Sequence, residues 1–187
     1  ATEAASDDAT LVVYRENRFC PFSSRLPQYY GDRIERVGGV ESVVPVRVLV
    51  SNCRASLDVV TFRGVPEAGI DQMIGDEAEV SGEGREGWRR RGDAAIVGES
   101  LAVRRGVKIG DRFSAAGITV YVAGIVASDR PQDRNVAYVH LPFLQESVSR
   151  GGTGGIVTQF QVTVDDPTRL EAVASEIDLA FANDEHP

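Results

Sequence analysis

The sequence predicts an α+β fold in two lobes: a core lobe of strand–helix units built from both chain ends, and a small β-rich lobe inserted between them. Three observations predict this fold. A strand pattern followed by an amphipathic helix pattern occurs near the start of the chain and again at its end. The glycine-rich stretch at residues 151–155 reads as a linker. The middle carries short β-branched runs punctuated by glycine.

The first strand–helix unit begins with a strand at residues 10–14 and a turn at residues 20–24. A helix follows, with Ser23 or Ser24 as its cap and Gly38 and Gly39 at its end. Its apolar face has a helical period and consists of Leu26, Tyr29, Tyr30, Ile34 and Val37. Strands are expected at residues 43–50, where Pro45 indicates an edge or a bulge, and at residues 57–63, pairing with each other.

The middle region opens with a polar, glycine-punctuated and highly charged stretch at residues 69–92, which we expect to form a surface excursion with little regular structure. Beyond it, strands are predicted at residues 94–97, around 118–126 and at 136–140. A short helix is predicted at residues 99–105 and a helical turn at 143–148. This composition is typical of a small β-rich lobe.

The final unit repeats the pattern of the first, with a strand at residues 158–164 and then a helix. Asp166 can cap this helix and Pro167 can occupy its first position. Its apolar face consists of Leu170, Val173, Ala174, Ile177 and Phe181. Because each amphipathic helix needs a sheet to cover, we expect residues 1–64 and 156–187 to share one sheet as the core lobe, with residues 65–155 as the inserted lobe.

Composition excludes several classes of protein. The chain has 187 residues, 28 of them acidic and 20 basic, and a net charge of −8. Such a chain is not drawn to nucleic acid or to anionic lipid by its overall field. The longest uncharged stretch, residues 113–128, is shorter than the roughly 20 apolar residues that span a bilayer. The polar N-terminus is not a signal peptide, and we expect the chain to be part of a longer polypeptide.

Neither a cofactor nor a metal is predicted. Residues 82–87 match G-x-G-x-x-G, but an acidic stretch precedes them and Trp-Arg-Arg-Arg follows, so the buried strand and apolar helix of a dinucleotide site are missing. No P-loop motif occurs. The acidic residues between Asp71 and Glu83 lack the regular offsets of a calcium loop, and the cysteines and histidines lack zinc spacing.

Two sets of residues allow alternative interpretations. Trp88, Arg89, Arg90 and Arg91 could form an exposed patch that docks a partner, because tryptophan and arginine are favoured at interfaces; alternatively the indole folds back over the small lobe. Cys20 and Cys53 could form one disulfide, which would add about 3–4 kcal/mol in the chain-entropy model, or remain two buried thiols.

The sequence gives little support to catalysis. His140 lies in a strand pattern, where a packing or surface role is expected, and His186 lies near the end of the chain. Asp165 and Asp166 precede a proline and a helix pattern, so capping accounts for them better than acid–base chemistry. We therefore predict no enzyme. A hydrolase that uses His140 would need a serine and an acid within hydrogen-bond reach of it.

An ordered set of segments resembles the extracytoplasmic core domain of MacB/FtsX-like ABC transporter permeases of the lipoprotein-release type. The matching segments are IERVGGVESVVP (34–45), FRGV (62–65), AIVGESLAVRRGVKIGD (95–111), VYVAGI (120–125), YVHLP (138–142) and FQVTVDD (160–166). The AIVGESLAVRRGVKIGD segment is the most specific. Together they cover nearly the whole chain, apart from residues 69–92, which match nothing in the family.

The resemblance implies a non-catalytic domain outside the cell membrane that relays ATP-driven motion to cargo export or lipoprotein release. It implies as partners a second permease copy, a cytoplasmic ABC ATPase subunit, and a periplasmic adaptor or a lipoprotein. An oxidising compartment would make a Cys20–Cys53 bridge reasonable. The cargo and the direction of transport stay open, and we expect the isolated chain to be monomeric.

The alternative function is a free-standing two-lobed module that binds a ligand or a partner. A cleft between the lobes with convergent polar groups would favour it. The permease hypothesis instead expects apolar helices of about 20 residues in the parent protein, one before Ala1 and one beyond Pro187 and a further strand.

Overall fold

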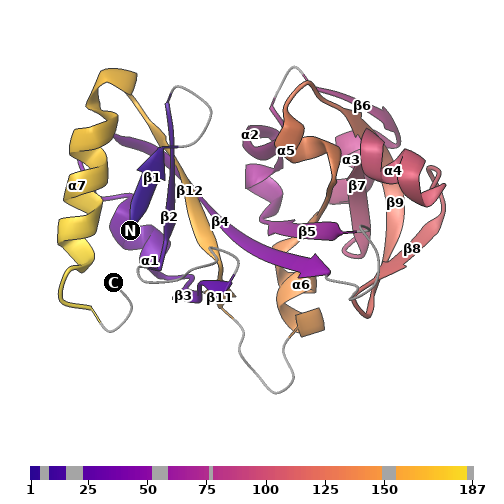
Figure 1. The fold of residues 1–187 in the computed structure, drawn as a ribbon, viewed down its shortest axis with the longest axis horizontal. Coiled ribbons are helices and arrows are strands. Elements are labelled where there is room, and N and C mark those ends of the chain that lie inside the picture. Colours follow the sequence, from indigo (N-terminus) through magenta and orange to yellow (C-terminus); the bar gives the residue numbers. More distant parts are fainter. Residues whose placement is uncertain (5–8, 16–22, 52–58, 76–77, 149–154, 185–187) are drawn as a thin grey trace. The chain divides into compact units, whose positions relative to one another are not determined.

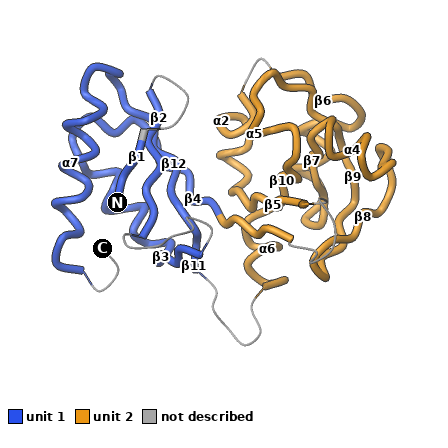
Figure 2. Tube along the Cα trace, in the orientation of Figure 1, with its two compact units in different colours: residues 1–46, 155–187 blue, residues 47–154 orange. Residues whose placement is uncertain are grey.

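The computed structural model of the protein describes residues 1–4, 9–15, 23–51, 59–75, 78–148 and 155–184. It divides into two compact units (Figures 1 and 2): unit 1 consists of Ala1–Val46 and Gly155–Pro187, and unit 2 of Arg47–Gly154. Both units combine strands with helices, so the predicted α+β class is confirmed. No helix in the described ranges is long and apolar enough to cross a membrane.

Unit 1 contains residues from both chain ends. Its elements are β1 (Thr2–Ala4), β2 (Thr10–Tyr14), β3 (Leu26–Pro27), α1 (Tyr30–Ile34), the first part of β4 (Val40–Ser51), β11 (Ile156–Val157), β12 (Gln159–Val164), the 3₁₀ helix η3 (Pro167–Arg169) and α7 (Leu170–Phe181). The strand order is β1-β2-β12-β4, and every pair is antiparallel. The prediction that residues 10–14 and 158–164 share one sheet is therefore confirmed.

Alternation along β2 and β12 gives this sheet one apolar face. Leu11 pairs with Val162 and Val13 with Phe160, and these four side chains are buried. The part of β4 that contains Pro45 is the edge strand of the unit 1 sheet. An edge position suits proline, because proline has no amide hydrogen to donate to a neighbouring strand. β4 continues beyond Val46 and pairs with β5 in unit 2.

Helix α1 is shorter than predicted. Leu26 and Pro27 form strand β3, which pairs with Ile156 and Val157 of β11, so the helix covers only Tyr30–Ile34. The apolar residues at the predicted start of the helix thus pair instead with a strand that lies more than one hundred residues later in the sequence. Tyr30 and Ile34 are buried, whereas Tyr29 is 70% exposed.

Helix α7 agrees with its prediction. Val173, Ile177 and Phe181, which are spaced four residues apart, are buried. Asp166 accepts hydrogen bonds from the backbone amide and the hydroxyl of Thr168, so it caps the 3₁₀ helix η3 that leads into α7, whereas α7 itself begins after Arg169 without a side-chain cap. These bonds favour the carboxylate and lower the pKa of Asp166.

Unit 2 is built on a mixed sheet. Its elements are the last part of β4, β5 (Val60–Val65), the 3₁₀ helix η2 (Glu67–Gly69), α2 (Ile70–Ile74), β6 (Glu79–Gly82), α3 (Gly84–Arg89), β7 (Ala94–Gly98), α4 (Glu99–Arg105), β8 (Arg112–Ala115), β9 (Ile118–Ala127), α5 (Pro131–Arg134), β10 (Val136–His140) and α6 (Leu141–Val148). The order is β4-β5-β10-β7-β9-β6, with β8 beside β9. The pairs β5–β10 and β7–β9 are parallel.

The prediction that residues 69–92 lack regular structure is wrong. They form α2, β6 and α3, because Ile70, Met73, Ile74 and Trp88 supply buried apolar anchors inside the polar sequence. Glycines end these elements: Gly75 and Gly82 have φ angles of +87° and +81°, which other residues rarely adopt.

The units meet in the sequence at residues 46/47 and 154/155, whereas the sequence placed the boundaries at 64/65 and 155/156. The first boundary differs because the last part of β4 and the whole of β5 belong to unit 2. Phe62 of β5 belongs to the core cluster of unit 2, and β5 pairs with β10 over residues 61–65. The glycine stretch at residues 151–154 lies outside the described residues.

Candidate functional site

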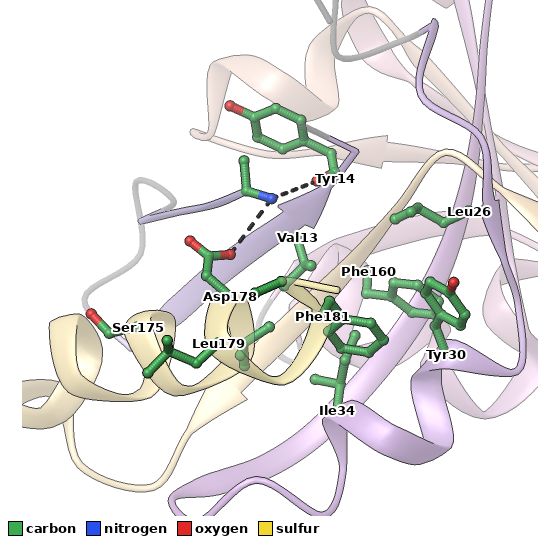
Figure 3. Close-up of a pocket in the computed structure, with 13 residues that line it drawn as sticks. Val13, Tyr14, Leu26, Tyr30, Ile34, Phe160, Ser175, Asp178, Leu179 and Phe181 are labelled. Atoms are coloured by element: carbon green, nitrogen blue, oxygen red, sulfur yellow. Dashed lines mark hydrogen bonds and ion pairs between the residues drawn. The ribbon is translucent and has the colours of Figure 1, made fainter. Parts of the chain in front are cut away.

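A pocket of about 500 Å³ lies within unit 1, between the sheet and the two helices (Figure 3). Val13 of β2 and Phe160 of β12 form its sheet side. Tyr30 and Ile34 come from α1, and α7 contributes Ser175, Ile177, Asp178, Leu179 and Phe181. The pocket is therefore assembled from segments that are far apart in the sequence.

Aromatic rings lie at one end of this pocket (Figure 3). The centroids of Tyr30 and Phe181 are 4.8 Å apart, and the guanidinium of Arg33 lies 4.6 Å from the Phe181 centroid. Gly31 allows α1 to approach the sheet, because a Cβ there would lie 3.3 Å from the ring of Phe160. Arg33 also bonds Asp184 at 2.6 Å, which ties α1 to the residues that follow α7.

The opposite end of the pocket is polar. Asp178 of α7 accepts a hydrogen bond from Thr2 Oγ1 at 2.8 Å and lies 3.5 Å from the Ala1 ammonium. The same ammonium donates to the carbonyl oxygen of Tyr14 at 3.0 Å. Hydrogen-bond donation to Glu3, together with partial burial, raises the pKa of Tyr14 to about 12.

Formal charge is distributed unevenly between the units. Residues 1–46 and 155–187 carry 14 acidic and 6 basic side chains, which gives unit 1 the whole net charge of −8. Residues 47–154 carry 14 of each, so unit 2 is formally neutral. The pocket thus lies in the unit that attracts cations.

Trp88, the first residue of the predicted docking patch, is 0% exposed. Its Nε1 donates to the carbonyl oxygen of Tyr138 at 3.0 Å, and its ring stacks on His140 with centroids 3.7 Å apart. The indole therefore folds back over the sheet of unit 2, one of the two arrangements that the sequence allowed. It offers no ring surface to a partner in this conformation.

The three arginines that follow Trp88 make ion pairs within unit 2. Arg89 pairs with Asp71, which Arg85 also contacts at 3.0 Å. Arg90 lies 3.6 Å from Glu83 and is the most exposed of the three. Asp71 and Glu83, considered above as calcium ligands, thus have arginine partners.

Arg91 belongs to a surface network with Asp93 and Tyr121. Its Nε lies 2.5 Å from Asp93, and its guanidinium lies 4.4 Å from the centroid of the Tyr121 ring. The hydrogen bond from Arg91 lowers the pKa of Asp93. Donation to Glu83 at 2.6 Å raises the pKa of Tyr121. The arginines therefore form a charged surface beside α3.

His140 shows the geometry of a packing residue. Its Nε2 bonds the carbonyl oxygen of Trp88 at 2.8 Å, and its ring lies against the indole. Within the described ranges, the structure brings neither a serine nor a carboxylate into hydrogen-bond reach of this imidazole. The arrangement required of a hydrolase is thus not formed by these residues.

A buried polar cluster in unit 2 was not anticipated from the sequence. Asp133 is fully buried and accepts hydrogen bonds from Tyr138 at 2.5 Å, Ser128 at 2.8 Å and Arg130 at 2.8 Å. Burial, reinforced by Asp133, raises the pKa of Tyr138 above its usual range, although Arg63 opposes the shift. Arg130 also donates to the carbonyls of Met73 and Ile74, which connects α2 to α5.

Cys20 and Cys53 lie outside the described residues. Both alternatives, one disulfide or two buried thiols, therefore stay open.

Comparison with known proteins places these observations in a family. The family model described as the MacB-like periplasmic core domain matches residues 1–180. Comparison of the sequence with curated proteins finds no match.

Solved structures share the fold. The extracellular domain of the noncanonic ABC-type transporter YknZ from Gram-positive bacteria matches with a TM-score of 0.66 and 16% identity, over 95% of this chain and 96% of that one. The periplasmic region of MacB from Actinobacillus actinomycetemcomitans matches with a TM-score of 0.64 and 14% identity, over 93% and 83% of the two chains. A domain of a putative permease protein from Porphyromonas gingivalis matches with a TM-score of 0.52 and 14% identity, over 95% and 86%.

Proposed function

Because this chain belongs to the family of MacB-like periplasmic core domains, the extracytoplasmic domains of ABC transporter permeases, we propose that it relays ATP-driven motion to cargo export or lipoprotein release. It does so through conformational change and protein contacts, without chemistry of its own. The domain works at the outer side of the cell membrane. Its partners are a second permease copy, the cytoplasmic ABC ATPase, and an adaptor protein or a lipoprotein.

The observation that carries this proposal is the division of a full-length family match into two compact units. Each unit has its own buried core, and the chain passes between them at residues 46/47 and 154/155. A domain made of two such units can change their arrangement relative to each other while both buried cores stay intact. The first passage lies inside the continuous strand β4, which can transmit force along its backbone.

The polar clusters also support a mechanical role. The buried cluster at Asp133 links α2, α5 and β10 by hydrogen bonds. The stack of Trp88 on His140 fixes α3 against the same strand. Because these groups satisfy one another, their contribution is to hold unit 2 together as one body.

Distance measurements in the complete transporter test the proposal. The membrane-embedded permease, assembled with its ATPase and with Cys20 and Cys53 replaced by serine, would carry spin labels at Glu176→Cys on α7 and Glu146→Cys on α6. Both positions are exposed, and they lie in different units. Double electron–electron resonance should show that the distance distribution shifts between the nucleotide-free and ATP-bound states.

A label pair inside one unit provides the control. Glu176→Cys with Glu41→Cys lies entirely in unit 1, at exposed positions, and its distances should stay unchanged through the cycle. An inter-unit distribution that is identical in every nucleotide state would contradict the relay.

A further inference from the structure

The charged surface beside α3 is not involved in the proposed relay, yet it has the composition of a protein-binding site. We propose that it binds an acidic segment of a partner protein, whose carboxylates pair with Arg90 and Arg112. We call it the arginine surface, and it consists of Glu83, Arg90, Arg91, Asp93, Arg112 and Tyr121. This inference goes beyond the proposed function, which assigns no contact surface to a partner, and does not depend on it.

Tyr121 of β9 lies at the centre of the arginine surface. Its ring centroid is 4.4 Å from the guanidinium of Arg91, and its hydroxyl donates to Glu83 at 2.6 Å. Arg112 of β8 stands directly opposite Tyr121 in the β8–β9 register, so both side chains lie on one face of these strands. Phe113, the next residue along β8, is buried in the core cluster of unit 2, so the face with Arg112 and Tyr121 points away from that core.

The arginines of this surface outnumber its carboxylates by one, in a chain whose net charge is −8. Asp93 gives both carboxylate oxygens to Arg91, at N–O distances of 2.5 and 3.1 Å. Arg112 lies 3.6 Å from Asp93, and Arg90 lies 3.6 Å from Glu83, distances too long for a hydrogen bond. The Arg90 and Arg112 side chains are 62% and 61% exposed, and neither guanidinium makes a hydrogen bond to another described residue. Both therefore have donors to offer.

A carboxylate suits these donors better than a phosphate does. A guanidinium presents a planar fork of N–H donors that matches the two oxygens of one carboxylate. A phosphate group, with nearly two negative charges, would be repelled by Glu83 and Asp93, which lie beside the same arginines. Arginine and tyrosine are also enriched at the centres of protein interfaces. The surface thus favours single carboxylates carried by a polypeptide.

Two hydroxyl groups continue the outer face of β8 and β9. Ser114 and Thr119 are opposite each other in the register, both are exposed, and their hydroxyls lie 2.8 Å apart. Hydroxyls can both donate to and accept from a peptide backbone. A segment that places a carboxylate on Arg112 can therefore gain further hydrogen bonds two residues along the strand.

Two capped decapeptides test the proposal on this 187-residue chain at low ionic strength. One alternates glutamate with alanine, and the other alternates glutamine with alanine. Nuclear magnetic resonance titration should show saturable shifts at Tyr121 and Ser114 with the glutamate peptide and none with the glutamine peptide. Added salt should weaken the binding, because the charges involved are exposed. The resonances of Phe181 in unit 1 should stay unchanged.

Arginine variants identify the groups that bind. Arg90→Gln and Arg112→Gln should each weaken binding of the glutamate peptide about threefold, a small factor because exposed ion pairs are weak. Arg134→Gln, at an exposed position on α5 of the same unit, is the matched control and should leave the affinity unchanged.

A carboxylate variant should act in the opposite direction. Glu83→Gln should tighten binding about twofold, because it removes a negative charge beside Arg90. Glu146→Gln, exposed on α6, changes the net charge equally and should have no effect. A purely structural role of the arginine surface does not predict tighter binding in any of these variants.

Equal binding of the two peptides, or unchanged affinity in both Arg90→Gln and Arg112→Gln, would overturn the proposal. Tighter binding of inorganic phosphate than of the glutamate peptide at the same resonances would overturn it in favour of a phosphate ligand. Shifts centred on unit 1, or association of the chain with itself through this surface, would overturn it as well.

Discussion

At the scale of single residues, the stability of unit 2 depends on a carboxylate whose role no sequence motif predicts. Asp133 is buried and receives three side-chain hydrogen bonds, from Tyr138, Ser128 and Arg130. A buried charge of this kind is tolerated only when its partners are complete. Removing one of these partners should therefore lower the free energy of unfolding by more than the loss of an average surface hydrogen bond does.

Tyr138→Phe should lower the free energy of unfolding by about 1–3 kcal/mol near neutral pH, because it leaves Asp133 short of one donor. The pKa of Tyr138 is raised in the folded state, whereas in the unfolded chain it is about 10. The stability linked to the neutral hydroxyl is thus complete below pH 10 and is lost as the pH rises above it.

Urea unfolding near pH 7 and near pH 11 checks this prediction. The difference between the original chain and Tyr138→Phe should be smaller at the higher pH. Tyr29→Phe, at an exposed ring, serves as the control and should show no such convergence. A constant difference at both pH values would show that Tyr138 is not the group responsible.

At the scale of elements, close backbone approach fixes how α5 meets the end of β7. A Cβ added to Gly98 would lie 2.1 Å from the carbonyl oxygen of Asp133 and 2.5 Å from that of Arg134. Both contacts are with backbone, so no side-chain rotation relieves them. The glycine is therefore required by packing, since its own φ of −62° suits any residue.

Gly98→Ala should destabilise the chain by about 1–3 kcal/mol, as overpacking does elsewhere. Gly92→Ala is the matched control, because nothing lies within 4 Å of a Cβ at that position. Equal unfolding midpoints for the two variants would mean that α5 does not approach β7 as described. Denaturant unfolding monitored by Trp88 fluorescence gives the measurement.

Elements with a clear local pattern could be predicted, and elements defined by distant partners could not. α7 follows from the spacing of Val173, Ile177 and Phe181, which needs no knowledge of the rest of the chain. Strand β3 requires β11 to be beside it, and the burial of Trp88 requires the carbonyl of Tyr138. The pocket likewise forms only where α7, β2 and α1 come together, so no local sequence pattern predicts it.

At the scale of the whole molecule, the average composition hides a separation of charge. A net charge of −8 over 187 residues suggests an evenly acidic surface, yet unit 1 carries all of it and unit 2 is neutral. The division could be calculated only once the structure showed which residues belong together. Because the charge is distributed in this way, salt should weaken the binding of a cationic partner to unit 1 more than its binding to unit 2.

The proposed relay requires above all that unit 1 is one body made from both chain ends. Val12 and Gln161 are half-buried partners in the β2–β12 register, at a separation that a disulfide can span. The double variant Val12→Cys/Gln161→Cys, in the membrane-embedded permease with Cys20 and Cys53 replaced by serine, should cross-link under mild oxidation and keep its ATP turnover. Val12→Cys/Thr163→Cys, displaced by two residues, should cross-link poorly. Failure of the first pair to cross-link, or loss of turnover once it has formed, would contradict the account.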